Sequence, residues 1–215
     1  MQKTEMFRNL KTIVVFCVFP VSLIIISFVE KSESLGFIMM MGCILPPMLT
    51  VASKIGEDRE RGVLRGLLYS GLKWNEYLMG IMIFVGLISF LFVCVMGMIL
   101  DSVQSSDTPV AIIITSMLSI ICSMTLGGVI GITSKNQNSI PAIQVPVSLF
   151  LVFSAVLGMT DEKIHKITKY LYTQAFMDMY LTKNVYWDAV LTMVINCILF
   201  IVLFGIVYVK RKKED

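Results

Sequence analysis

The chain has 215 residues, of which 56% are hydrophobic and 15% are charged, and its formal net charge is +3. A compact water-soluble domain of this length could not hide so much apolar surface, so the composition excludes an ordinary soluble globular protein. It predicts an all-α polytopic membrane protein in which residues 1–215 form a single transmembrane domain.

Six apolar runs are long enough, or nearly so, to cross a hydrocarbon layer of about 30 Å as helices. Before the first run, the amphipathic stretch that contains Met6, Phe7 and Leu10 predicts an N-terminal interfacial helix. Pro46 and Pro47 lie inside the second run and predict a kink or a partial unwinding of that helix. The predicted spans cover residues 13–29, 35–52, 77–100, 109–132, 140–159 and 190–209.

Lysine and arginine are distributed unevenly between the segments that connect these runs. If both termini lie in the cytoplasm, 13 of the 18 Lys and Arg residues fall on the cytoplasmic side and five on the outer side. The positive-inside rule therefore predicts a multi-pass cell-membrane protein with both termini, and residues 54–76, in the cytoplasm.

The five cysteines all lie inside apolar runs, and no pair has the C-x-x-C spacing. This placement favours a role as small apolar packing residues over disulfides or a metal site. A lone histidine, His165, cannot form a His-based metal site by itself, so no metal site is predicted. The cysteines are Cys17, Cys43, Cys94, Cys122 and Cys197.

The segment 160–189, between the fifth and sixth spans, has apolar residues at helical spacing. It predicts one or two amphipathic helices that lie on the extracellular face or dip partway into the bilayer. Its four lysines run against the positive-inside trend. Long loops cross the membrane largely regardless of charge, and the alternative interpretation is a lid or a contact with an anionic partner. The apolar positions are Ile164, Ile167, Leu171, Ala175, Phe176 and Met179.

Residues 57–72, between the second and third spans, form a predicted amphipathic helix. Leu64, Leu67, Leu68 and Leu72 share one face of it, and charges crowd its first turns. Its glycines lower helix propensity but let another backbone approach closely. The pattern fits an interfacial helix on the inner leaflet equally well as a docking helix for a cytoplasmic protein.

The stretch "EDRERGVLRGLLYSGLKWNEYLMG" resembles the motif of ABC-2 type transporter permeases, at the place where that family carries it. The family pattern is an acidic-basic pair, a glycine, a leucine pair, Ser-Pro-Leu, and an acidic residue before an aromatic one. Val63 stands where the family usually has threonine, and Gly71 where it usually has proline. The matching positions are Glu60, Arg61, Gly62, Val63, Leu64, Leu67, Leu68, Ser70, Gly71, Leu72, Glu76 and Tyr77.

The resemblance implies the permease subunit of an ATP-driven exporter, with a cytoplasmic coupling helix that docks on a separate ATPase. No G-x-x-x-x-G-K-[ST] loop occurs in the sequence, so no bound cofactor is expected on this chain, and ATP and magnesium would bind the partner. Two ATPase copies, a second identical or homologous permease and membrane lipid are the expected partners, with no nucleic acid. The implied coupling residues are Glu57, Arg59, Glu60, Arg61, Gly62, Leu64, Leu67 and Leu68.

Within the spans, a ladder of small residues at four-residue spacing predicts close helix packing, inside the subunit or at a dimer seam. The ladder consists of Ser119, Ser123, Gly127 and Gly131. The amide of Asn196 is predicted to bond to another helix, and a substrate contact, together with Pro46 and Pro47, is the alternative. Methionine and phenylalanine give soft apolar walls, which are ordinary lipid-facing positions or a path for amphipathic cargo such as a peptide or antibiotic.

Two other classes of protein compete with the permease interpretation. A non-transporting scaffold or sensor would recruit a cytoplasmic partner through residues 54–76. An intramembrane enzyme is disfavoured, because the sequence has no histidine pair, no G-x-S-x-G motif and no pair of acids in the middle of a span, and no catalytic residue is predicted. The missing mid-span carboxylate also argues against ion-coupled transport.

Overall fold

A computed structural model describes residues 33–63, 66, 69–71, 73–104, 109–134, 137–182 and 185–214, with backbone only at several helix ends. The predicted first span, 13–29, and the predicted N-terminal interfacial helix lie outside these residues. Every regular element in the described part of the chain is helical. The all-helical class is therefore confirmed for this part.

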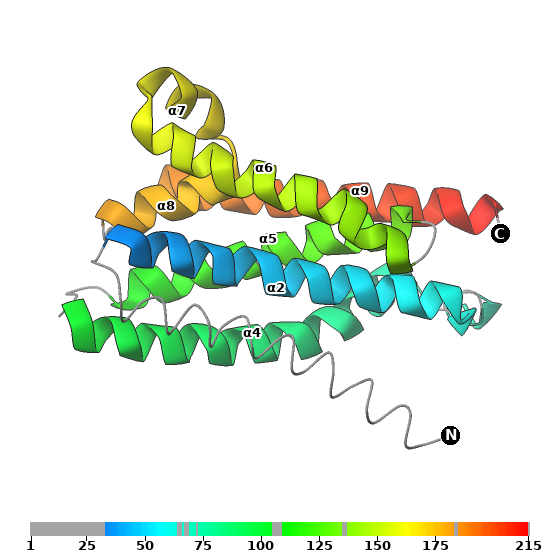
Figure 1. Cartoon of the computed structure of the whole chain (residues 1–215). Helices are drawn as coiled ribbons and strands as arrows, with labels where there is room; N and C mark the ends of the chain where they lie inside the picture. The colour runs from blue at the N-terminus through cyan, green and yellow to red at the C-terminus, as the bar shows by residue number, and fades with distance from the viewer. Residues whose placement is uncertain are drawn as a thin grey trace.

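Five long helices run back and forth alongside one another (Figure 1). Within the described ranges, each of the five is long and apolar enough to cross a membrane, and each contains one of the last five predicted spans nearly or completely. The remaining predicted span, 13–29, is the one that lies outside the described residues. The five are α2 (Glu33–Glu60), α4 (Trp74–Gln104), α5 (Pro109–Thr133), α6 (Ile140–Thr160) and α9 (Trp187–Glu214).

Local sequence explains where these helices begin. The backbone N–H of Lys73 donates to Oε2 of Glu76 at 3.2 Å, which is half of a capping box at the start of α4. Helix α6 has a proline in its first turn, where no intrahelical N–H bond is lost. A short 3-10 turn, η1 (Gln137–Ser139), leads into it.

The prolines of α2 do not unwind it. The helix continues through Pro46 and Pro47, both of which are buried, so the predicted unwinding is wrong. The hydroxyl of Thr50 donates to the carbonyl oxygen of Pro46 at 2.8 Å and reinforces the turn after the prolines. Packing of α2 against its neighbours is what holds the helical geometry despite two missing N–H donors.

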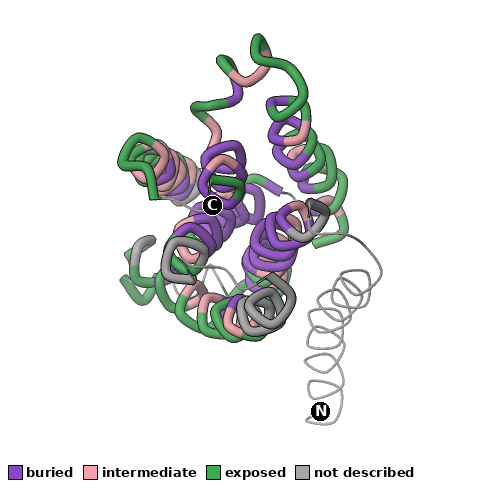
Figure 2. The backbone as a smooth tube through the Cα atoms, turned by 90° about the vertical axis from the view of Figure 1, so that its left-hand side faces the viewer, coloured by how far each residue is buried: buried purple, intermediate pink, exposed green. Residues whose placement is uncertain are grey.

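The closest approach in the bundle is between α2 and α5, which make the most extensive contact of any two helices. A side-chain carbon added at Gly127 would collide with the backbone of Met48, and one at Gly131 would lie 2.8 Å from the carbonyl oxygen of Ala52. The small-residue ladder thus meets a helix of the same chain. Its other members, Ser119 and Ser123, are fully buried, and buried residues gather along the axis of the bundle (Figure 2).

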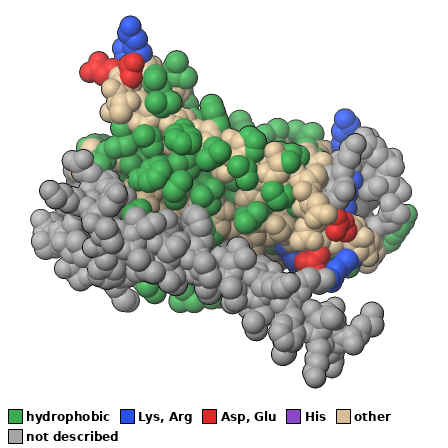
Figure 3. Space-filling view, viewed as in Figure 1, with side chains coloured by type: hydrophobic (Ala, Val, Ile, Leu, Met, Phe, Trp, Pro, Cys, Tyr) green, Lys and Arg blue, Asp and Glu red, His purple; other side chains and the backbone are tan. Residues whose placement is uncertain are grey.

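Polar and apolar surfaces separate along the bundle. Figure 3 shows hydrophobic side chains over its middle and charged ones at the two ends, on the face that the view presents. One end carries residues 61–73, the α5–α6 connection and the C-terminus, and the other carries α7 (Glu162–Thr168) and α8 (Tyr172–Thr182). This separation is expected of a membrane protein, because charged side chains are stable only outside the hydrocarbon layer.

The α2–α5 contact predicts opposite outcomes for one substitution at two glycines. Gly127→Ala should destabilise the protein by about 1–3 kcal/mol, because overpacking forces the backbones apart. Gly80→Ala, on α4, meets open space and should be neutral or stabilise the helix by about 1 kcal/mol. The thermal unfolding midpoint of each purified variant in detergent measures both, and equal midpoints would contradict the packing described.

Candidate functional site

After α2 ends, the chain forms a tight turn and a short second helical segment. The N–H of Gly62 donates to the carbonyl oxygen of Arg59 at 3.0 Å, and Gly62 has a φ of +70°. The backbone is helical again at Val63, Gly66 and Tyr69. The prediction of a single helix over 57–72 is therefore wrong, because a left-handed residue ends α2 and only glycine adopts that conformation without strain.

The stretch 61–73 is called here the coupling segment, and its described residues are 61–63, 66, 69–71 and 73. All its described side chains are exposed, and Tyr69 is 80% exposed. Gly71, near its end, has a φ of +85°, and an added carbon at Gly62, Gly66 or Gly71 would meet nothing within 4 Å in this chain. The predicted coupling residues Leu64, Leu67 and Leu68 lie outside the described residues.

A buried hydrogen bond joins the helix ends on the two sides of the coupling segment. Asp58, near the end of α2, is 7% exposed, and Tyr77, near the start of α4, is 6% exposed. The Tyr77 hydroxyl donates to Oδ2 of Asp58 at 3.1 Å, and Nζ of Lys54 donates to Oδ1 at 2.8 Å. Sequence reasoning included Tyr77 in the family motif but missed Asp58 and Lys54. The signal that could have identified Asp58 and Lys54 was Tyr77 itself, a tyrosine directly after the polar loop whose hydroxyl needs an acceptor.

The last turn of α2 is also joined to the α5–α6 connection. The guanidinium of Arg59 donates to the carbonyl oxygen of Ser134, and Oε1 of Glu60 accepts from the N–H of Gln137 at 2.7 Å. Glu57 pairs with Arg61 at 3.1 Å along the helix. Glu57, Arg59 and Glu60, predicted to contact an ATPase, thus make contacts inside this chain, while Arg61 and Gly62 begin the exposed segment.

At the other end of the bundle, α8 is inserted among the long helices. The side chains from Tyr172 to Met177 are all buried, and the Tyr172 hydroxyl lies 3.1 Å from the hydroxyl of Ser123, in the middle of α5. The rings of Tyr172 and of Phe200 on α9 pack edge to face, with 6.2 Å between their centroids.

The amide of Asn196 secures the turn between α7 and α8. Its nitrogen donates to the carbonyl oxygen of Tyr170 and to that of Thr192, both at 2.8 Å. The described part of 160–189 contains two helices, α7 and α8, which is within the predicted one or two. Whether either lies on the extracellular face or dips into the bilayer stays a prediction.

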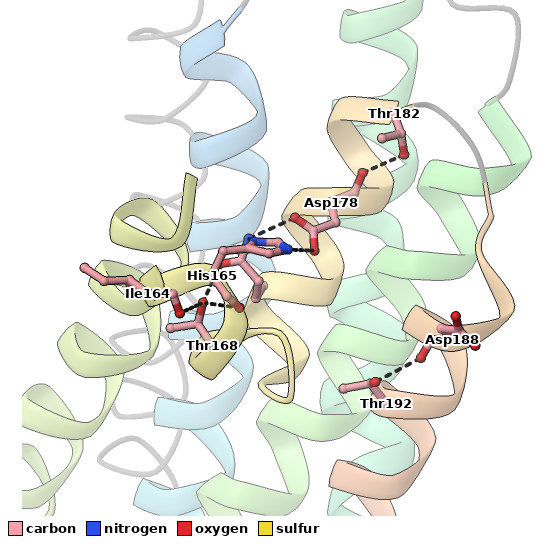
Figure 4. A network of polar contacts seen from close by, with 8 residues as sticks. Ile164, His165, Thr168, Asp178, Thr182, Asp188 and Thr192 are labelled. Atoms are coloured by element: carbon pink, nitrogen blue, oxygen red, sulfur yellow. Dashed lines mark hydrogen bonds and ion pairs between the residues drawn. The ribbon is translucent and has the colours of Figure 1, made fainter. Parts of the chain in front are cut away.

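A polar cluster joins α7 to α8, and Figure 4 shows the His165 ring beside Asp178, with Thr168 on the same short helix as His165. The buried amide of Gln174 lies 3.2 Å from Nδ1 of His165 and donates to Oδ1 of Asp178 at 2.8 Å. Thr168 donates to Oε1 of Gln174 at 3.2 Å. An added carbon at Gly158 would collide with this amide and hydroxyl, so α6 closes over the cluster.

Comparison with known proteins gives one family match. A family model described as "ABC-2 family transporter protein" matches residues 29–209 of the chain. No curated protein and no solved structure matches the sequence.

The two left-handed glycines of the coupling segment predict a position-dependent effect of alanine. Gly62→Ala and Gly71→Ala should each cost about 1–2 kcal/mol of local stability, because a side chain disfavours that conformation. Gly66→Ala should not, since Gly66 is helical and equally unobstructed. Hydrogen exchange of peptides over 61–73 measures this, and equal exchange in all three variants would contradict the turn geometry.

The cluster between α7 and α8 predicts a loss on Gln174→Leu. The substitution leaves Asp178 and His165 without the amide donor and should cost about 1–3 kcal/mol. Amide exchange in α7 should rise accordingly. Gln137→Leu is the matched control, because Gln137 is an exposed glutamine outside the cluster and its contact with Glu60 uses only the backbone N–H. Unchanged exchange of α7 in Gln174→Leu would show that the cluster does not hold the two helices together.

Proposed function

Because the chain belongs to the ABC-2 transporter family, whose model matches residues 29–209, we propose that its coupling segment is the docking site of a separate ATP-binding subunit. Family membership makes the chain a multi-pass membrane permease component that works with an ABC ATPase. The finer proposal is that ATP-driven movement of that subunit pushes on residues 61–73 and repacks the membrane helices.

The observation that carries the proposal is the form of the coupling segment. It projects from the bundle with every described side chain exposed, while its two ends are fixed by buried contacts between α2 and α4. A segment that only lay on lipid would gain little from a rigid base. A segment that receives force from a protein needs both an accessible surface and a firm attachment.

The energy source and the assembly follow from the same proposal. ATP and magnesium bind the ATPase subunit, since the sequence of this chain has no phosphate-binding G-x-x-x-x-G-K-[ST] loop. Two ATPase subunits and a second permease, identical or homologous, complete the transporter. Residues 61–73, the α5–α6 connection and both termini lie in the cytoplasm, as the distribution of Lys and Arg supports.

The proposed cargo is an amphipathic or apolar molecule, such as a peptide or an antibiotic, moved outward for export or self-immunity. Support comes from the apolar side chains that dominate the described spans and from polar residues that are mostly hydroxyls and amides. Within the described membrane helices, the buried carboxylate is that of Asp58, which lies close to the end of α2. The middle of these helices therefore offers no charged side chain that could bind an ion on its way across the membrane.

Co-purification tests the docking proposal. From tagged wild-type chain in mild detergent, an ABC ATPase subunit should co-purify in equal amount. Tyr69→Asp should reduce the recovered ATPase at least about tenfold, because a charge in the centre of an interface is left desolvated and unpaired. The double change Leu67→Asp and Leu68→Asp should do the same.

Tyr186→Asp is the matched control, because Tyr186 is also an exposed tyrosine but lies at the opposite end of the bundle. It should retain the ATPase at the wild-type level. Recovery of the ATPase with Tyr69→Asp and with the double leucine variant would contradict the docking site. A different class of cytoplasmic protein in place of the ATPase would favour a scaffold or sensor.

A further inference from the structure

We propose that Asp58 and Tyr77 are positioning residues: their contact, called here the clasp, makes α2 and α4 move as one unit when the ATPase subunit pushes on the coupling segment. The inference rests on the proposed function and adds the path by which force leaves the docking site. Asp58, Tyr77 and Lys54 are not themselves part of the exposed docking surface.

The clasp is a strong and direct connection between the two helices. Both oxygens of the buried Asp58 carboxylate have donors, Tyr77 at 3.1 Å from α4 and Lys54 at 2.8 Å from the preceding turn of α2. A buried carboxylate is costly to leave without partners, so the arrangement strongly favours α4 staying in contact with α2. The two residues are 19 positions apart in sequence and enclose the whole coupling segment.

The coupling segment itself is poorly suited to transmit force without this base. Gly62 and Gly71, near its two ends, are left-handed glycines with open space around them. Glycine rotates readily about its backbone bonds, so a push on the segment would be absorbed as bending at these turns. The clasp joins the helix ends just beyond the turns, so the part of the displacement that passes the turns moves α2 and α4 together.

Helix α2 carries this displacement across the bundle. It is unbroken over 28 residues, about 42 Å at 1.5 Å per residue, and reaches both ends of the molecule. Near its other end, an added carbon at Gly36 would lie 2.5 Å from the ring of Tyr180 on α8. A shift of α2 along its axis therefore displaces α8, the helix that is inserted among the spans.

Helix α4 is linked to the rest of the bundle directly after the clasp. The side chain of Leu78 lies 3.0 Å from the position of an added carbon at Gly128 of α5, and Phe204 of α9 lies 3.2 Å from the same position. Three helices thus meet one residue beyond Tyr77. Movement of the α4 start reaches α5 and α9, both of which also contact α8.

Hydrogen exchange of the whole complex tests the clasp. The chain is purified with its co-purifying ATPase subunit in lipid nanodiscs, and exchange is compared without nucleotide and with ATP, magnesium and vanadate. In the wild type, nucleotide should alter exchange both in peptides over 61–73 and in peptides over 172–182. In Tyr77→Phe, the response in 61–73 should persist. The response in 172–182 should fall to about one tenth of its wild-type size, because losing one hydrogen bond to a charged group lowers the equilibrium constant of the α2–α4 contact about tenfold.

Three variants separate positioning from stability. Asp58→Leu should behave as Tyr77→Phe does, and it carries the test if Tyr77→Phe lowers the yield of folded complex. Asp58→Asn keeps an acceptor for Tyr77 and should retain the response in 172–182. Tyr186→Phe removes the same hydroxyl from an exposed tyrosine outside the coupling segment and should also retain it.

The results distinguish failure of the clasp from failure of the proposed function. A response of wild-type size at 172–182 in both Tyr77→Phe and Asp58→Leu overturns the clasp, while the docking site stands. Absence of an ATPase subunit from the wild-type complex, or no nucleotide response in 61–73, overturns the proposed function and removes the premise of the clasp.

Discussion

The contact between α2 and α5 is the constraint on which the rest of the structure depends. Gly127 and Gly131 let the backbone of α5 approach that of α2, so the two helices form an inner pair against which the others pack. In a membrane, apolar side chains gain little by leaving lipid, so association relies on this kind of close fit. It also explains why α2 stays helical through two prolines: a neighbour on each side leaves no room for the chain to unwind.

Helix α2, continuous from Glu33 to Glu60, connects the two ends of the molecule. At one end it leads into the coupling segment and is joined to α4 by Asp58 and to the α5–α6 connection by Arg59 and Glu60. At the other end it touches α8 at Tyr180. The polar contacts therefore lie at the base of the exposed segment and around α8. The apolar part of α2 between them is one continuous helix, which sets the distance between the two ends.

Helix α8 belongs to the connection between two membrane helices, yet most of its side chains are buried in the bundle. Its hydroxyl and amide side chains are buried among the spans, where Tyr172 meets Ser123 and Gln174 joins α7 through His165 and Asp178. Polar groups so placed need partners. Tyr172 and Gln174 find them in α5, in α7 and within α8, whereas Oγ1 of Thr173 has no hydrogen-bond partner among the described residues. The same helix contacts α2 where Gly36 meets the ring of Tyr180, and it is the helix that our proposal has a displacement of α2 reach.

The sequence by itself determined the membrane class, the positions of the last five spans, the two helices of 160–189 and the family motif, because hydropathy and local spacing are properties of the chain alone. The tertiary structure decided what those residues contact. The charges of 57–61 looked alike in sequence, yet Asp58 is buried against Tyr77, Arg59 and Glu60 bind the α5–α6 connection, and Arg61 is exposed. Helical spacing predicted one helix over 57–72, but Gly62 adopts a left-handed turn there. Glycine allows both conformations, and only the positions of the helix ends, fixed by packing of distant segments, select between them.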